Sequence, residues 1–142
     1  MSMTGLLCAL LLLQFPSWSL RGETAGWLAS LANRGYTVFQ YHGLLLSLNR
    51  PQLIPVTLQA FGDGIFGALG GPHARVIRME LLKDDEILSQ CGTDDLPLIP
   101  MVADSANMVT HIRLTLEETT HGALAESVFV YAVLKPVDPD GL

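Results

Sequence analysis

Between residues 36 and 136, the chain is a series of short segments in which apolar and polar residues alternate, with turn residues between them. A period of two is typical of β-strands that bury one face and expose the other. Residues 74–82 and 107–117 show it most clearly, whereas residues 128–134 are apolar on both faces and predict a central, doubly covered strand. About six to eight strands are expected, so the chain is predicted to be an all-β, antiparallel sandwich or barrel.

A short helical segment is expected before the strands. In residues 23–33, Trp27, Leu28 and Leu31 share one face at helical spacing, and Gly35 supplies a left-handed residue at which the helix can stop. An alternative is an α+β fold, in which residues 5–33 form helix packed on one curved sheet. Residues 62–72 hold five glycines in eleven positions and are expected to form a mobile loop.

The first 19 residues are expected to be a signal peptide. Leu6 to Phe15 is a ten-residue apolar run, too short to span a bilayer and of the length of a signal-peptide core, and Ser17 and Ser19 suit cleavage after Ser19. The alternatives are a retained membrane anchor and a buried helix. The expected organisation is thus 1–19 signal peptide, 20–34 helical segment or linker, 35–136 β-sandwich domain and 137–142 polar tail, in a secreted or extracellular protein.

The charge of the chain argues against nucleic acid as a partner. Eight Lys and Arg residues oppose fourteen Asp and Glu residues, a net charge of −6, and no stretch is basic enough to neutralise a phosphate backbone. Nucleic-acid binding is therefore not expected. Membrane contact is expected only through the N-terminus, if that segment stays uncleaved.

One candidate metal site is acidic. Asp84, Asp85, Asp94 and Asp95 fall at two predicted turns, and hard oxygen ligands of this kind suit Ca²⁺ if both turns lie at the same end of the sandwich. Aspartate is equally common in ordinary turns, so the alternative is no cofactor at all.

One candidate interface is aromatic. The sequence predicts that Phe39, Tyr41, Phe129 and Tyr131 either pack in the core or are buried between subunits, because a chain with 49% hydrophobic residues has apolar surface to cover.

Part of the pattern resembles the jelly-roll superfamily of tumour necrosis factor and the complement globular head. Its aromatic strand is similar to the run through Gly35, Phe39, Tyr41 and His42, although Thr37 stands where the family has Tyr. The run from Met79 to Asp84 looks like its hairpin, and Phe129, Leu134 and Pro136 match its last strand. The resemblance implies a jelly-roll sandwich and a secreted trimer that binds a receptor. In that family other strands precede the aromatic strand, whereas here only the helical segment does.

Function is expected to be recognition rather than catalysis. The sequence has no nucleophile–base motif, no metal motif and no phosphate-binding loop, so the chain is predicted to be a non-enzymatic module that binds a protein partner or receptor and self-associates. A structural assembly subunit, for example of a virion or appendage, is the second hypothesis. A small enzyme that uses the thiol of Cys91 is the third.

Overall fold

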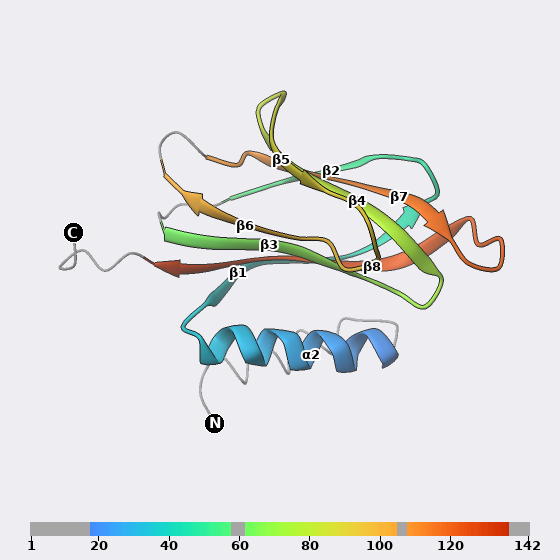
Figure 1. Cartoon of the computed structure of the whole chain (residues 1–142), viewed down its shortest axis with the longest axis horizontal. Coiled ribbons are helices and arrows are strands. Elements are labelled where there is room, and N and C mark those ends of the chain that lie inside the picture. Colours follow the sequence, from blue (N-terminus) through green and yellow to red (C-terminus); the bar gives the residue numbers. More distant parts are fainter. Residues whose placement is uncertain (1–17, 58–61, 105–107, 137–142) are drawn as a thin grey trace.

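The computed structural model describes residues 18–57, 62–104 and 108–136, with side chains from Ala25 to Lys135. One helix precedes eight strands in this part of the chain (Figure 1). In chain order they are α2 (Trp18–Asn33), β1 (Thr37–Ser47), β2 (Gln52–Pro55), β3 (Gly62–Gly70), β4 (Ala74–Lys83), β5 (Glu86–Cys91), β6 (Leu98–Ala103), β7 (His111–Thr119) and β8 (Ala125–Pro136).

The strands form two four-stranded antiparallel sheets. Sheet A has the order β1-β8-β3-β6, and sheet B has the order β2-β7-β4-β5. Consecutive strands alternate between the sheets except at the β4–β5 hairpin, which is the connectivity of an eight-stranded jelly roll. The predicted all-β sandwich after a short helical segment is confirmed, and the alternative of a single curved sheet is wrong because half of the strands form a second layer.

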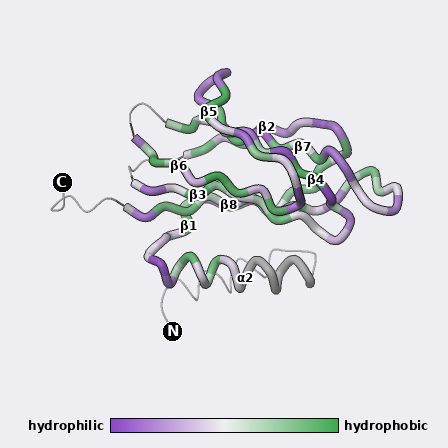
Figure 2. The backbone as a smooth tube through the Cα atoms, in the orientation of Figure 1, coloured by the Kyte–Doolittle hydropathy of each residue, from purple (hydrophilic) through white to green (hydrophobic). Residues whose placement is uncertain are grey.

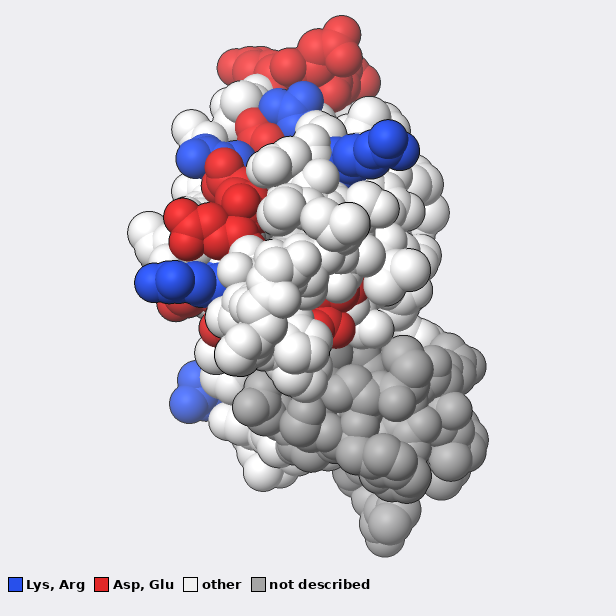
Figure 3. All heavy atoms as spheres, turned by 90° about the vertical axis from the view of Figure 1, so that its right-hand side faces the viewer, with Lys and Arg blue, Asp and Glu red and all other residues white. Residues whose placement is uncertain are grey.

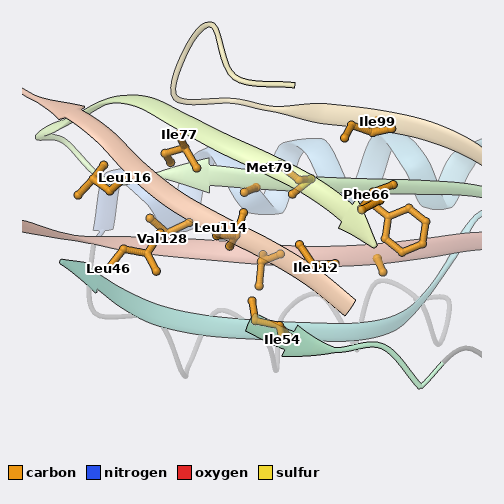
Figure 4. Close-up of a cluster of buried hydrophobic side chains, with 14 of the residues drawn as sticks. Leu46, Ile54, Phe66, Ile77, Met79, Ile99, Ile112, Leu114, Leu116 and Val128 are labelled. Atoms are coloured by element: carbon orange, nitrogen blue, oxygen red, sulfur yellow. The ribbon is translucent and has the colours of Figure 1, made fainter. Parts of the chain in front are cut away.

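The main core lies between the two sheets, as the alternation predicted. Ile77, Met79 and Leu81 of β4 are fully buried there. Beside them on the neighbouring strand of the same sheet, β7, lie Ile112, Leu114 and Leu116. Figure 4 shows Ile77, Met79 and the three β7 side chains on the same side of the fold interior as Phe66 and Val128 of sheet A, and all of them belong to one buried cluster. Burial of this apolar surface is the main force that holds the sheets together.

Helix α2 lies against the outer face of sheet A, on the side away from sheet B (Figure 1). Leu28 and Leu31 are each 1% exposed and pack on the sheet, as their spacing predicted. The helix ends where expected. Gly35 has a φ of 91° and donates to the carbonyl of Ala32, and Tyr36 donates to that of Leu31, the Schellman pattern.

The glycine-rich segment is a strand, so the prediction of a mobile loop over residues 62–72 is wrong. Residues 62–70 form β3, which pairs with β8 on one side and β6 on the other. Ile65, Phe66, Ala68 and Leu69 still alternate between the two faces of the sheet, and each packs in one of the two cores. Figure 2 shows this strand among the hydrophobic parts of the fold, with hydrophilic residues at the tip of the β4–β5 hairpin.

Strand β6 could not be recognised from the sequence, because Pro97 directly precedes it and Pro100 lies within it. Residues 92–100 include Pro97, Pro100 and two aspartates, which are typical of loops, yet Leu98–Ala103 pairs with β3 along its length. Because Ala68 donates to the carbonyl of Pro97, Ile99 and Met101 direct their backbone groups at β3, and Pro100 directs its nitrogen at the free edge. Proline is tolerated at that place in an edge strand, where no partner needs a donor.

The N-terminal expectations fall mostly outside the described residues. The described helix begins at Trp18, so the expected cleavage point after Ser19 lies in its first turn, while residues 1–17 are not described. The predicted polar tail, residues 137–142, also lies outside. Of the helices in the described ranges, none has the length and apolar character needed to cross a membrane.

Candidate binding site beside helix α2

The two outer faces of the sandwich differ in chemistry. Sheet B carries ion pairs between β4 and β7: Arg113 Nη2 lies 2.7 Å from Glu80 Oε2, and Arg78 Nε lies 3.1 Å from Glu117 Oε1. The hydrogen bonds from Arg113, together with its charge, lower the pKa of Glu80 against the opposing effect of burial. Figure 3 shows acidic and basic groups gathered along one side of the molecule. Arg113 with Glu80 and Arg78 with Glu117 thus pair with one another on this face.

The outer face of sheet A is apolar and only partly covered by α2. Beneath the helix, Phe129 lies between Tyr41 and Tyr131, with ring centroids 6.2 Å from each and planes 25° apart. Phe129 and Tyr131 are 1% and 3% exposed. The rings form a stacked row across β1 and β8, which the helix covers with Leu28 and Leu31.

Tyr131 reaches from β8 across the neighbouring strand. A Cβ atom at Gly67 would lie 2.2 Å from the Tyr131 hydroxyl, so the phenol rests on β3 at a position where a side chain is missing. Trp27 Nε1 of α2 donates a hydrogen bond to the same hydroxyl at 2.5 Å. Burial raises the pKa of Tyr131 to about 12, although the Trp27 hydrogen bond opposes this. The phenol therefore keeps its proton at neutral pH.

Tyr131 is also one of the residues that line a cavity of about 360 Å³. Its walls come from the helix, from β3 and β8, and from the segment that enters β6. The lining residues are Trp27, Ala68, Leu69, Leu96, Leu98 and Tyr131. Small-molecule pockets typically have about 300–1,000 Å³ with mostly apolar walls and a few polar groups, and this cavity falls in that range.

Strand β6 continues the apolar surface beyond the cavity. Leu98, Pro100 and Val102, the β6 strip, are all exposed, with Val102 at 55%. A second cavity, of about 230 Å³, is lined along the same strand by Pro100, Met101 and Val102, and by Tyr36 and Asp63. Outward positions on a solvated sheet are usually polar, so this apolar edge is unusual.

The predicted aromatic interface is divided between two places. Phe39 is the extra residue of a β-bulge between Val38 and Gln40, and it packs edge-on against Phe66 between the sheets, at 6.4 Å. Tyr41, Phe129 and Tyr131 lie on the other face, under α2. The chain's own helix, and not a second subunit, covers Phe129 and Tyr131.

The four aspartates do not come together. Asp84 and Asp85 form the tip of the β4–β5 hairpin. Asp94 and Asp95 lie beyond the other end of β5, where their carbonyls accept from Ile77 and Gly70. The expected shared calcium site is wrong in this respect, because the strands of the hairpin separate the two turns. No group of three or more His, Cys, Asp and Glu side chains suited to a metal occurs within residues 18–57, 62–104 and 108–136.

The candidate nucleophile lies away from the apolar face. Cys91 is a free, partly buried cysteine at the end of β5, opposite Met79, and it packs against the main core. Its thiol is therefore on the opposite sheet from the two cavities.

Sequence reasoning missed both the cavity and the β6 strip. It singled out Tyr131 but not Trp27 as its hydrogen-bond partner, because α2 and β8 are joined only by the tertiary fold. The available signal was the alternation of Leu98, Pro100 and Val102, which the two nearby prolines obscured.

No protein-family model matches the chain, and no curated protein matches it at a significant level. The resemblance to the tumour necrosis factor and complement superfamily therefore stays a prediction. The aromatic run that suggested it lies in β1, which no strand precedes among the described residues.

Proposed function

We propose that this chain is a non-catalytic recognition module that binds protein, including further copies of itself, through the β6 strip. The observation that carries the proposal is the exposed apolar row of Leu98, Pro100 and Val102 beside α2. Contiguous apolar surface of this kind is costly in water and is typical of interaction sites. Half-exposed Trp27 and Tyr36 flank the strip, and aromatic residues are enriched in such interfaces.

The form of the contact follows from the edge. Pro100 presents no N–H at the free edge of β6, so a continuous sheet across two molecules is disfavoured. The partner would instead pack its side chains on the strip. The opposite face of the sandwich, with its internally paired charges, offers less apolar surface for the same purpose.

Sedimentation velocity over a range of concentrations tests the proposal. Val102→Asp places a charge in the strip at an exposed position, so it should weaken association at least about tenfold while leaving the fold intact. Leu53→Asp is the matched control, because Leu53 is 57% exposed on β2 of the other sheet. A wild-type chain that stays monomeric to high micromolar concentration, or equal effects of both variants, would contradict the proposal.

Secretion is part of the proposal and needs its own test. A signal peptide over residues 1–19 would give a mature chain that starts at Leu20. Expression in secreting cells, followed by intact mass measurement of the medium, should find that mass. An uncleaved chain retained in the cells would favour the membrane-anchored alternative.

The second candidate function is a structural assembly subunit. The jelly-roll connectivity favours it only by analogy, since capsid subunits share this fold and fold does not determine function. The sedimentation experiment separates the two. A small discrete oligomer, such as the trimer that the resemblance implies, supports recognition, whereas large ordered particles support assembly.

A further inference from the structure

The hydroxyl of Tyr131 is a buried hydrogen-bond donor whose proton has no acceptor among the described residues. Tyr131 is 3% exposed, and its oxygen accepts from Trp27 Nε1. Within the part of the chain that the structure describes, no group accepts the proton of this hydroxyl. A buried donor left unsatisfied costs about 1–3 kcal/mol, so such groups are rare and need an explanation.

Tyr131 lines the 360 Å³ cavity, and its hydroxyl lies over Gly67 of the neighbouring strand. Tyr131 extends over Gly67, and Gly67 pairs with Leu98, which forms the next part of the cavity wall. The phenol therefore extends from β8 over β3 toward Leu98 of β6, so its polar end is directed at this part of the cavity wall. The other side chains of the lining are aliphatic, apart from the indole of Trp27, whose N–H is already used.

Water is a poor match for this arrangement. Water in the open cavity finds one free donor among the lining side chains and otherwise meets apolar walls, so an apolar molecule displaces it at little cost. A mostly apolar molecule that carries a single acceptor oxygen matches both the walls and the donor. Its apolar body would cover the leucines, and its oxygen would accept from Tyr131.

We propose that the cavity between Trp27, Tyr131 and Leu98 binds a small apolar molecule with one hydrogen-bond acceptor oxygen, such as a cyclic ketone. This site adjoins the β6 strip and shares Leu98 with it, but Val102 does not line the cavity, so a substitution there tests the protein-binding function alone. The ligand oxygen accepts the Tyr131 proton in a hydrogen bond, and no covalent step is involved.

Two probes of the same shape test the proposal: 1-indanone, which has a carbonyl oxygen, and indane, which has none. Each is titrated into ¹⁵N-labelled full-length protein while amide shifts are followed. We expect both to shift the amides of Gly67, Ala68 and Leu98, with indanone bound about three- to tenfold more tightly, the range expected for one net hydrogen bond. Equal affinities, shifts elsewhere, or no shifts at millimolar probe would overturn the proposal.

Two test variants and two control variants make the result specific. Tyr131→Phe removes the donor but keeps the ring, so the preference for indanone should vanish while indane still binds. Leu98→Trp should fill the cavity and abolish binding of both probes, whereas Leu53→Trp on the opposite sheet should change neither. Val102→Asp should also leave both affinities unchanged, which keeps failure of this site distinguishable from failure of the β6 strip. If Tyr131→Phe keeps the preference, the hydroxyl is not the recognition group.

Discussion

Gly67 lies in the middle of a strand that has neighbours on both sides, where glycine normally weakens a sheet. Here the missing side chain makes room for another residue. The Tyr131 phenol occupies the place above Gly67 and so reaches both Trp27 and the cavity. At the scale of the residue, the absence of one Cβ atom determines where the hydroxyl of Tyr131 is held on this apolar face.

Gly67→Ala is therefore expected to destabilise the protein by about 1–3 kcal/mol, since the new Cβ would displace the phenol and its Trp27 hydrogen bond. Chemical denaturation with far-UV detection measures the loss. Gly26→Ala is the matched control, because no atom lies within 4 Å of its Cβ position and alanine favours the helix interior. A Gly67→Ala protein as stable as the wild type would show that the phenol can lie elsewhere at no cost.

Glu80 gives a second prediction at this scale, a pH dependence. Its pKa is lowered in the folded state by the hydrogen bonds and charge of Arg113, so its stabilising effect is present above the carboxyl's ordinary range and is lost as the pH falls through it. Between pH 6 and pH 3, the free energy of unfolding should therefore fall less in Glu80→Gln than in the wild type. Glu118→Gln, at an exposed position, should fall as the wild type does. Parallel curves for Glu80→Gln and wild type would refute the coupling.

At the scale of the element, periodicity predicted strands well where one face was buried and the other charged. Strands β4 and β7 follow the expected alternation, and β8 is doubly covered as its continuous apolar run indicated. The failures were β3 and β6, where glycine and proline are usually turn residues. Glycine and proline are tolerated in these strands because of tertiary neighbours that the sequence alone does not show. The Tyr131 ring lies over Gly67, and Pro100 lies at a free edge of the sheet.

Pro100 protects the free edge of β6 from pairing with a strand of another molecule, and its substitution should permit such pairing. Pro100→Val would supply an N–H at the free side of β6, where exposed apolar side chains already favour association, so light scattering should detect new or larger oligomers. Pro55→Val on β2 is the control. Gln40 Nε2 donates to the Pro55 carbonyl at 2.6 Å, so the Gln40 side chain already covers the free edge of β2 at this position. If both variants associate alike, the protection of β6 is not specific.

At the scale of the whole molecule, the candidate site could not be predicted because it is made of distant segments. Helix α2 comes before the sandwich, Tyr131 lies near its end, and β6 lies between them in the chain. The fold class needed only local patterns, whereas the cavity needed four segments, from α2, β3, β6 and β8, placed side by side. The predicted calcium site was wrong for a related reason. The two aspartate-containing turns lie at opposite ends of the β4–β5 hairpin, and the sequence does not show that its strands hold them apart.

The same topology predicts slow folding. The first strand, β1, pairs with the last, β8, and most of the fold consists of such non-local pairings. Chains of this kind fold in milliseconds to seconds, because loop closure precedes the gain from contacts. Stopped-flow refolding followed by tryptophan fluorescence should give time constants in that range. Folding within microseconds would mean that local structure, such as α2, dominates the barrier.

The antiparallel pairing of β1 and β8 also fixes which way the molecule would face on a support. Strand β8 ends where β1 begins, since Thr37 pairs with Leu134, and the loops after β1, β3 and β7 lie at the far pole (Figure 1). A chain tethered through a tag fused after residue 136 would present these three loops outward. The β6 strip would lie along the side of each tethered molecule and face the strips of neighbouring molecules. Dense immobilisation would therefore promote side-by-side contacts that are too weak to form in dilute solution.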